Sequence, residues 1–289
     1  MSASFCAKRF GSTEMISSLA VTPIKRIVAS HELLWNLTLR ELRTKYRKSV
    51  LGWTWSMLNP LATVAIYTFV FGYLFQAVAP VGDPSGVKVF ALYLLCGLLP
   101  WNFFMLVTGT GMASMLQNAA LVRKVSFPRE ILVFAQSLHG LVQFSIEMGL
   151  FAVVLLIATT TFIPWIPVVL FQMLLLMMFA SGVALALAAG NVYFRDLGYL
   201  WQIFSQVWFF ATPIVYTEET LKGRVAPIVL TILQWNPMAV FARGFRRSMY
   251  DGQFAGWTNL GACTIMAVVS LVVGWSIFTK LSRRFAEEL

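Results

Sequence analysis

The sequence predicts an all-α integral membrane protein with six transmembrane helices. Hydrophobic residues make up 58% of the 289-residue chain and charged residues only 12%, a balance outside the range of ordinary soluble domains. The charged residues leave long gaps, which lie between Lys48 and Asp83, Lys88 and Arg123, Glu147 and Arg195, Asp196 and Glu218, and Asp251 and Lys280. A bilayer core about 30 Å thick needs about 20 apolar residues in a helix, so each gap supplies at least one crossing and the longest supplies two.

We expect the six crossings near 53–78, 87–111, 131–159, 165–190, 198–216 and 257–279. Pro164 and Pro167 interrupt the longest apolar run and mark the turn between the third and fourth crossings. Pro60 and Pro213 lie inside crossings, where each removes a backbone hydrogen bond and is expected to kink its helix. Residues 51–289 therefore form one transmembrane domain, with both termini on the same side.

The basic residues indicate which side of the membrane this is. Of the 22 lysines and arginines, sixteen share the side of the termini, and the other six are Lys88, Lys222, Arg224, Arg243, Arg246 and Arg247. Because positive charge is retained in the cytoplasm, both termini are expected there, together with the loops at 112–130 and 191–197. The segment 217–256 is then external. The same rule explains the net charge of +10 without a nucleic-acid partner.

Residues 30–50 predict an amphipathic helix on the cytoplasmic surface, which Ser30 can cap. The apolar face would carry Trp35, Leu39, Leu42 and Tyr46, and the basic face Arg40, Arg43 and Arg47. This pattern is typical of a helix in the membrane interface. Such a helix either anchors the chain or shapes a cytoplasmic entrance for the substrate. Residues 1–29 form an N-terminal tail to which we assign no role.

The external segment, about 217–256, is too long for a simple connection and predicts a re-entrant or interfacial helical hairpin between the fifth and sixth crossings. Asn236 and Pro237 are a typical helix start. Arg243, Arg246 and Arg247 follow within the same helix, on one face. Guanidinium groups bind phosphate oxygens in two-pronged fashion, so this face is expected to contact a lipid head group, specifically or by simple snorkelling.

Polar side chains form a stripe on the third crossing. Gln136, His139, Gln143 and Glu147 are spaced by three, four and four residues, which places them on one helix face. Polar groups are costly in hydrocarbon, so the stripe either lines a substrate passage or holds helices together by hydrogen bonds. Trp53, Trp55 and Trp201 are further candidates for the passage, where aromatic rings could stack on sugars, or they belong to the interfacial aromatic belt.

The cytoplasmic loop before the third crossing is short and basic. It contains Arg123, Lys124, Phe127, Pro128 and Arg129. A short helix here could dock into the groove of a partner, with Phe127 as its apolar anchor. The alternative is an ordinary basic cytoplasmic loop without a partner.

Motifs for chemistry within this chain are missing from the sequence. It contains no G-x-x-x-x-G-K-[ST] nucleotide loop, no G-x-S-x-G elbow and no grouping of His and Cys typical of zinc. The cytoplasmic loops between crossings offer only Glu130 and Asp196, which are not placed as a hydrolytic pair. We therefore expect a protein that is not an enzyme, binds no cofactor or metal itself, and takes any energy it needs from a partner.

Several motifs resemble the permease subunits of polysaccharide ABC exporters, which move O-antigen, capsular or teichoic acid polymers. Leu51-Gly-Trp-Thr-Trp-Ser-Met-Leu-Asn-Pro60, preceded by Arg43-Thr-Lys-Tyr-Arg47, is similar to the entry to the first crossing in that family. Val122-Arg-Lys-Val-Ser-Phe-Pro-Arg129 resembles its coupling helix. The match is completed by Asn191-Val-Tyr-Phe-Arg-Asp-Leu197, Phe210-Ala-Thr-Pro-Ile-Val-Tyr216 and Asn236-Pro-Met238.

The resemblance implies a type-2 ABC exporter in the bacterial cytoplasmic membrane. Two copies of the chain would form the pore, and two copies of a separate ATPase subunit would bind ATP and Mg²⁺ below it. The substrate would be a polysaccharide on a lipid carrier, typically undecaprenyl diphosphate. The alternatives are a drug or lipid exporter of the same fold, a membrane-embedded enzyme of lipid-linked sugar metabolism, and a passive channel.

Overall fold

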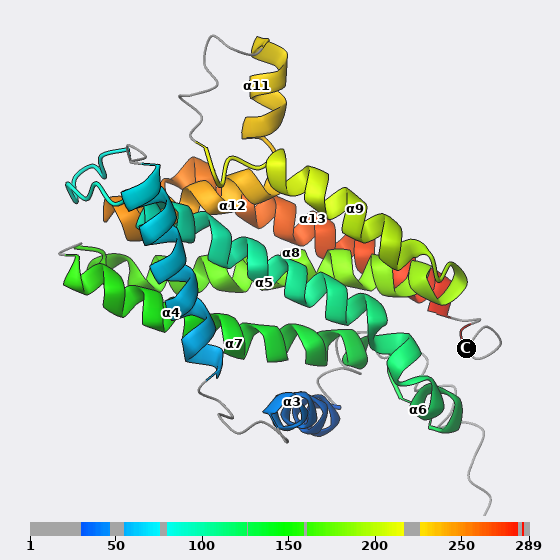
Figure 1. Ribbon diagram of the computed structural model, residues 1–289. Coiled ribbons are helices and arrows are strands. Elements are labelled where there is room, and N and C mark those ends of the chain that lie inside the picture. The colour runs from blue at the N-terminus through cyan, green and yellow to red at the C-terminus, as the bar shows by residue number, and fades with distance from the viewer. Residues whose placement is uncertain are drawn as a thin grey trace, which may run out of the picture.

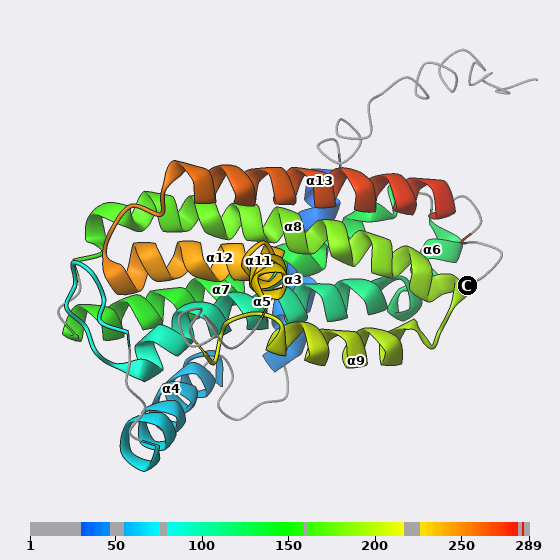
Figure 2. The same ribbon diagram turned by 90° about the horizontal axis from the view of Figure 1, so that it is seen from above.

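The computed structural model describes residues 30–46, 55–75, 80–125, 127–158, 161–216, 226–282 and 285, and every regular element in these ranges is helical. This confirms the all-α prediction. Four long helices lie side by side and form the body of the molecule: α5 (Phe90–Gln117), α7 (Glu130–Ile157), α8 (Ile166–Tyr193) and α13 (Trp257–Leu281) (Figures 1 and 2). Within the described residues, these are the four helices long and apolar enough to cross a membrane.

The closest contact in the body is between α8 and α13. Gly182 and Gly274 bring the two backbones together so tightly that a Cβ on either residue would collide with the other helix. Ser270 adds a hydrogen bond from its Oγ to the carbonyl of Phe179 at 2.8 Å. Small residues at such a crossing allow extensive van der Waals packing, which drives helix association in lipid.

The fifth predicted crossing is divided in the structure. Helix α9 (Leu197–Phe210) has 14 residues, and at about 1.5 Å per residue it covers about 21 Å, less than a bilayer core. It ends before Pro213, which lies in the turn 211–216 and not inside a helix as expected. The chain returns among the long helices as α12 (Pro237–Phe245), which continues as the π-helix η5 (Arg246–Asp251).

Seven of the nine residues of α12 are buried, which places this helix inside the bundle. Such a return is what a re-entrant segment requires. The preceding helix α11 (Pro227–Gln234) stands crosswise to α12 and away from the bundle, so the two meet at their junction and do not pair as the arms of a hairpin (Figures 1 and 2). Residues 217–225 of the expected hairpin lie outside the described residues.

The first predicted crossing is represented by α4 (Trp55–Tyr67) and the π-helix η3 (Thr68–Leu74), which lean away from the long helices (Figure 1). Many large apolar side chains of this segment are exposed, including Leu58, Ile66, Phe69 and Tyr73. Pro60 lies within α4. A segment with so much exposed apolar surface is suited to contact lipid or another protein chain.

The segment predicted as an amphipathic helix forms a helix, α3 (His31–Tyr46), which crosses the direction of the long helices (Figures 1 and 2). Leu37 and Thr38 are buried on the side that packs against α7, whereas Trp35 is 59% exposed. The N-terminal tail 1–29 and the end of the predicted helix, 47–50, lie outside the described residues. The short 3-10 turn η4 (Ile163–Trp165) leads into α8.

Candidate functional site

The predicted coupling loop lies at the end of the bundle that also holds the C-terminal residues. A short helix, α6 (Ala119–Lys124), projects there beyond α5 (Figure 1). Arg123 and Lys124 are exposed, and Val125 beside them is 51% exposed. Phe127 and Pro128 are half-buried, and Phe127 packs against the core. The outward surface of this element is therefore basic with an apolar residue at its edge.

Arg129, the last residue predicted for coupling, points back into the protein. Its guanidinium donates a hydrogen bond to the carbonyl of Ser282 and lies 5.8 Å from the centre of the Phe285 ring. Tyr193, at the end of α8, donates to the carbonyl of Leu281 at 2.9 Å. The start of α7 and the ends of α8 and α13 are thus joined beside the predicted coupling loop.

The amphipathic helix α3 is connected to the same region. Arg40 donates to Asn118 Oδ1 at 2.8 Å and forms an ion pair with Glu41 at 2.7 Å. Asn118 is the residue between α5 and α6, and its amide also donates to the carbonyl of Ser114 at 2.9 Å. A force applied to α6 therefore reaches both α5 and α3 directly.

The polar stripe on α7 faces protein. Gln136, His139 and Glu147 are each at most 9% exposed, while Gln143 is half-buried. Gln143 donates to Glu147 Oε1 at 2.8 Å along the helix. Burial within one copy of the chain and the hydrogen bond between Gln143 and Glu147 are compatible with the packing alternative. Whether the stripe also reaches a passage stays a prediction.

The three predicted tryptophans are separated. Trp53 lies outside the described residues, and Trp55 begins α4. Trp201 is 9% exposed and packs between α9 and α5, against the rings of Phe104, Phe204 and Trp208 at centroid distances of 6.1, 5.7 and 6.2 Å. Trp201 therefore fixes α9 onto the bundle with its ring covered by protein.

The outer face of α9 carries the polar residues Gln202 and Gln206, which the sequence places on one stripe of the fifth predicted crossing. Tyr199 is 72% exposed and Phe204 is 54% exposed, and Gln202 and Gln206 on the same helix are also exposed. Leu200, Ile203 and Val207 are exposed as well, so amide, aromatic and aliphatic side chains share the open surface of α9. A sequence cannot distinguish these aromatic residues from Trp201 because both kinds recur at helical spacing.

The turn after α9 and the start of α12 meet in space. Asn236 caps α12 by accepting a hydrogen bond from the backbone N–H of Met238 at 3.2 Å, as its sequence position predicted. The Asn236 side chain also accepts from Trp208 Nε1 at 2.7 Å and donates to the carbonyl of Ala211 at 3.1 Å and to Thr212 Oγ1 at 2.9 Å. One amide therefore joins α9, the turn and α12.

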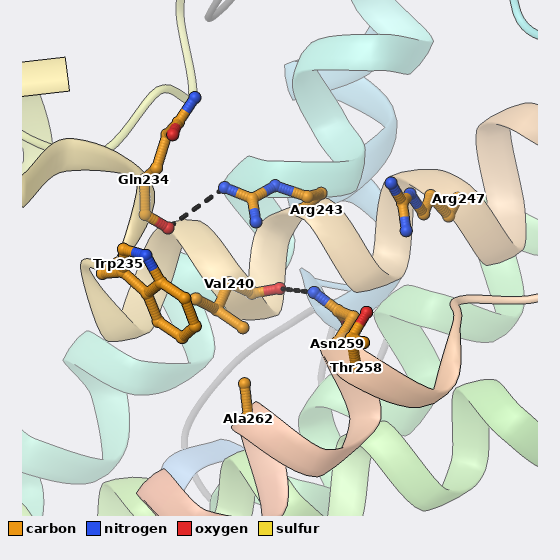
Figure 3. Close-up of a pocket in the computed structure, with 8 residues that line it drawn as sticks. All are labelled: Gln234, Trp235, Val240, Arg243, Arg247, Thr258, Asn259 and Ala262. Atoms are coloured by element: carbon orange, nitrogen blue, oxygen red, sulfur yellow. Dashed lines mark hydrogen bonds between the residues drawn. The ribbon is translucent and has the colours of Figure 1, made fainter. Parts of the chain in front are cut away.

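The three predicted head-group arginines do not act as one group. Arg246 is 8% exposed and turns inward, where it donates to the carbonyls of Pro213 and Ile214 at 2.6 and 2.8 Å. Arg243 and Arg247 lie on another side of α12 and line a cavity of about 270 Å³ (Figure 3). We call this cavity the arginine pocket; its lining residues are Gln234, Trp235, Val240, Arg243, Arg247, Thr258, Asn259 and Ala262.

Comparison with known proteins identifies relatives along most of the chain. Residues 32–250 match the family model described as ABC-2 type transporter. The O-antigen export system permease protein RfbA of Myxococcus xanthus is 30% identical over 268 residues, which cover 92% of this chain and 98% of the relative. The protein of the same name from Klebsiella pneumoniae is 27% identical over 89% of this chain and 95% of its own length. The polysialic acid transport protein KpsM of Escherichia coli is 22% identical over 84% and 90%.

Proposed function

The chain belongs to the ABC-2 type transporter family, and on that premise we propose that it is the permease subunit of an exporter that moves a polysaccharide across the bacterial inner membrane. The observation that carries the proposal is end-to-end similarity: 98% of an O-antigen export permease is covered at 30% identity. Relatives named for polysialic acid and for capsule polysaccharide extend the similarity to other polymers. The chain is a multi-pass membrane protein and a transport subunit.

A separate ATPase subunit supplies the energy and binds ATP and Mg²⁺. Its docking site on this chain is α6 with the following loop, because this element projects from the bundle and exposes Arg123, Lys124 and Val125. Arg129 and Phe127 hold the loop against the ends of α7 and α13. In this arrangement both termini and α6 are cytoplasmic, and the loop between α12 and α13 is external.

A second copy of the chain completes the pore. Apolar side chains are exposed along α4, α9 and α11. They include Leu61, Ile66, Ile203, Val207, Ile228 and Ile232. Contact between copies would cover part of this surface. The six crossings are then the four long helices, α4 with η3, and α9 with α12.

The passage for the polymer is formed in part by the outer face of α9. Gln202 and Gln206 can exchange hydrogen bonds with sugar hydroxyl groups, and the exposed rings of Tyr199 and Phe204 can stack on sugar C–H faces. The polymer travels on a lipid diphosphate such as undecaprenyl diphosphate. The relatives named for O-antigen, polysialic acid and capsule polysaccharide favour a polymer over a drug or a simple lipid.

Deletion and complementation of the gene test the proposed function. Cells without this chain are expected to lose the polymer from their surface and to accumulate it inside, still attached to its lipid. Expression of the chain restores surface polymer only when the ATPase partner has an intact nucleotide site. Normal surface polymer in the deletion strain, or restoration with an inactive ATPase, contradicts the proposal.

A further inference from the structure

The arginine pocket lies where three separate segments meet. Gln234 and Trp235 come from the end of α11, Val240 and Arg243 from α12, and Thr258, Asn259 and Ala262 from the first turns of α13 (Figure 3). Asn259 closes one side by donating to the carbonyl of Val240 at 3.0 Å. The cavity is therefore built by tertiary contacts.

Two positive charges line this cavity from the same helix face. Arg243 and Arg247 are four residues apart, and both guanidinium groups lie on the same side of α12 (Figure 3). Arg243 donates to the carbonyl of Gln234 at 3.0 Å and Arg247 to the carbonyl of Ala255 at 3.3 Å. A carbonyl orients a guanidinium and carries no net charge, and the Arg247 charge also interacts with the carboxyl group of Asp251. Like charges at this spacing repel, and an anion between them would offset the repulsion.

The backbone around Gly256 brings one of these charges close to a helix start. Gly256 has a φ of 88°, a value that favours glycine, and it precedes the first residue of α13. A Cβ at this position would lie 3.2 Å from Arg247 Nη1, so a larger residue would crowd the guanidinium. The positive end of the α13 dipole adds to the charge of the two arginines.

A buried polar group lies directly behind the pocket wall. Gln172 of α8 is fully buried, and within the described residues its amide nitrogen and oxygen have no hydrogen-bond partner. Its amide lies beside Gly244 and close to Asn259, which lines the pocket. An amide without a partner in the interior is costly, and a buried water is the ordinary partner for such a group, so the region behind the pocket is polar.

Beyond the pocket, the surface of α13 becomes apolar. Ala262 lines the pocket, and Ile265, Val269, Val272 and Val273 continue from it at helical spacing with exposed fractions of 66%, 54%, 59% and 51%. Exposed branched side chains on a membrane helix face lipid or another chain. A molecule with an anionic head and a long apolar tail would match both the pocket and this stripe.

We propose that the arginine pocket binds the phosphate group of a membrane lipid, whose chain lies along the exposed stripe of α13. Arg243 and Arg247 hold the phosphate oxygens, and Asn259 and Thr258 accept or donate hydrogen bonds to the hydroxyl groups of the head group. Trp235, which is 64% exposed, lines the pocket. This refines the sequence prediction, because Arg246 is committed to the protein interior. The lipid is an anionic phospholipid or, if the proposed export function holds, the polyprenyl diphosphate carrier.

Native mass spectrometry of the purified complex with its ATPase tests the site. The complex is stripped of lipid and offered phosphatidylglycerol, undecaprenyl diphosphate and, as a lipid without phosphate, diacylglycerol. The test variant is Arg243→Gln with Arg247→Gln. The matched control is Lys88→Gln, which removes an exposed cation from the loop that packs against η5 at the same end of the bundle. Thermal unfolding verifies that each variant is folded.

We expect the wild-type complex to retain a phosphate-bearing lipid at least about tenfold more tightly than the double variant, with Lys88→Gln unchanged. Arginine-dependent retention of undecaprenyl diphosphate assigns the pocket to the carrier, and that of phosphatidylglycerol assigns it to a phospholipid. The proposal is overturned if the wild type and the double variant retain the phosphate-bearing lipids equally. It is also overturned if Lys88→Gln loses as much lipid as the double variant, or if the wild type binds diacylglycerol as tightly as the phosphate-bearing lipids. If the double variant does not fold, Arg247→Gln alone replaces it. Because lipid is measured directly, the result does not depend on whether polymer is exported.

Discussion

The guanidinium of Arg246 lies 3.9 Å from the centre of the Tyr93 ring, and its Nε donates to the carbonyl of the same residue at 3.4 Å. With the hydrogen bonds to the carbonyls of Pro213 and Ile214, one buried side chain connects the end of α12 to α5 and to the turn after α9. A planar guanidinium can stack on a ring and donate at its edges simultaneously, whereas an ammonium cannot. This contact fixes α12 in the bundle.

Replacing Arg246 by alanine should therefore destabilise the protein by about 3 kcal/mol, because buried carbonyls lose charged donors and a cation–π contact disappears. Lysine should rescue only part of this loss. Thermal unfolding in detergent measures the effect, and the exposed Arg195→Ala is the matched control. Equal transition temperatures for Arg246→Ala and Arg195→Ala would show that the buried contact carries no stability.

Two pairs of substitutions separate docking from folding at the coupling loop. Arg123→Glu with Lys124→Glu changes exposed charges only, so the ATPase should co-purify poorly while the unfolding temperature of the permease is kept. Phe127→Ala with Arg129→Ala removes contacts to the core and to Ser282, so this pair should also lower the unfolding temperature. Undiminished co-purification of the ATPase with the first pair would place its docking site elsewhere.

Cysteine labelling can locate the passage. Cysteines at Gln202 and Gln206 should react with water-soluble thiol reagents in the assembled exporter, because the structure exposes both positions on the outer face of α9. Ser205→Cys, only 3% exposed on the same helix, is the unreactive control. Cysteines at Gln136 and Glu147 should be protected unless transport opens the bundle. If positions 202 and 206 are as inert as 205, the outer face of α9 contacts lipid or protein and not the polymer.

The carboxyl group of Asp251, at the end of η5, predicts a pH dependence of stability. Burial raises the pKa of Asp251 from 3.8 to about 6, against the opposing effects of hydrogen bonds from the Asp83 backbone and Gln253 and of the Arg247 charge. Between pH 3.8 and about pH 6, the folded state binds more protons than the unfolded state. The free energy of unfolding therefore falls as the pH rises toward 6 and stays constant above pH 6. Asp251→Asn should abolish this slope. Unfolding temperatures between pH 4 and 8 measure it, and an unchanged slope in the variant would assign it to another group.

The long helices could be predicted because apolar length alone specifies them, and α3 because its faces differ in charge. The start of α12 could be predicted because an Asn-Pro pair caps a helix locally. These features depend on neighbours in the sequence. The division of the fifth crossing depends on distant contacts: Asn236 with Trp208 and Ala211, and Arg246 with Pro213.

For a related reason, the sequence could not predict that Arg246 points away from Arg243 and Arg247. Arg243, Arg246 and Arg247 share a face only in a continuous α-helix, and the chain changes to a π-helix at Arg246. A π-turn alters the direction of each following side chain. Arg246 also finds carbonyls and an aromatic ring that no spacing rule places beside it. The arginine pocket has the same origin, since α11, α12 and α13 contribute to it from separate parts of the sequence.

The glycine contact between α8 and α13 limits how the exporter can move. The backbones of α8 and α13 are in close contact at Gly182 and Gly274, so sliding of one helix along the other would bring larger residues into this contact. We therefore expect the two helices to move together as one rigid unit. At the C-terminal end of α13, Ser282 accepts a hydrogen bond from Arg129, beside the predicted coupling loop. At the N-terminal end of α13, Asn259 lines the arginine pocket. In the proposed arrangement, a movement of the ATPase at the α6 end is transmitted through α13 to the opposite end of the bundle.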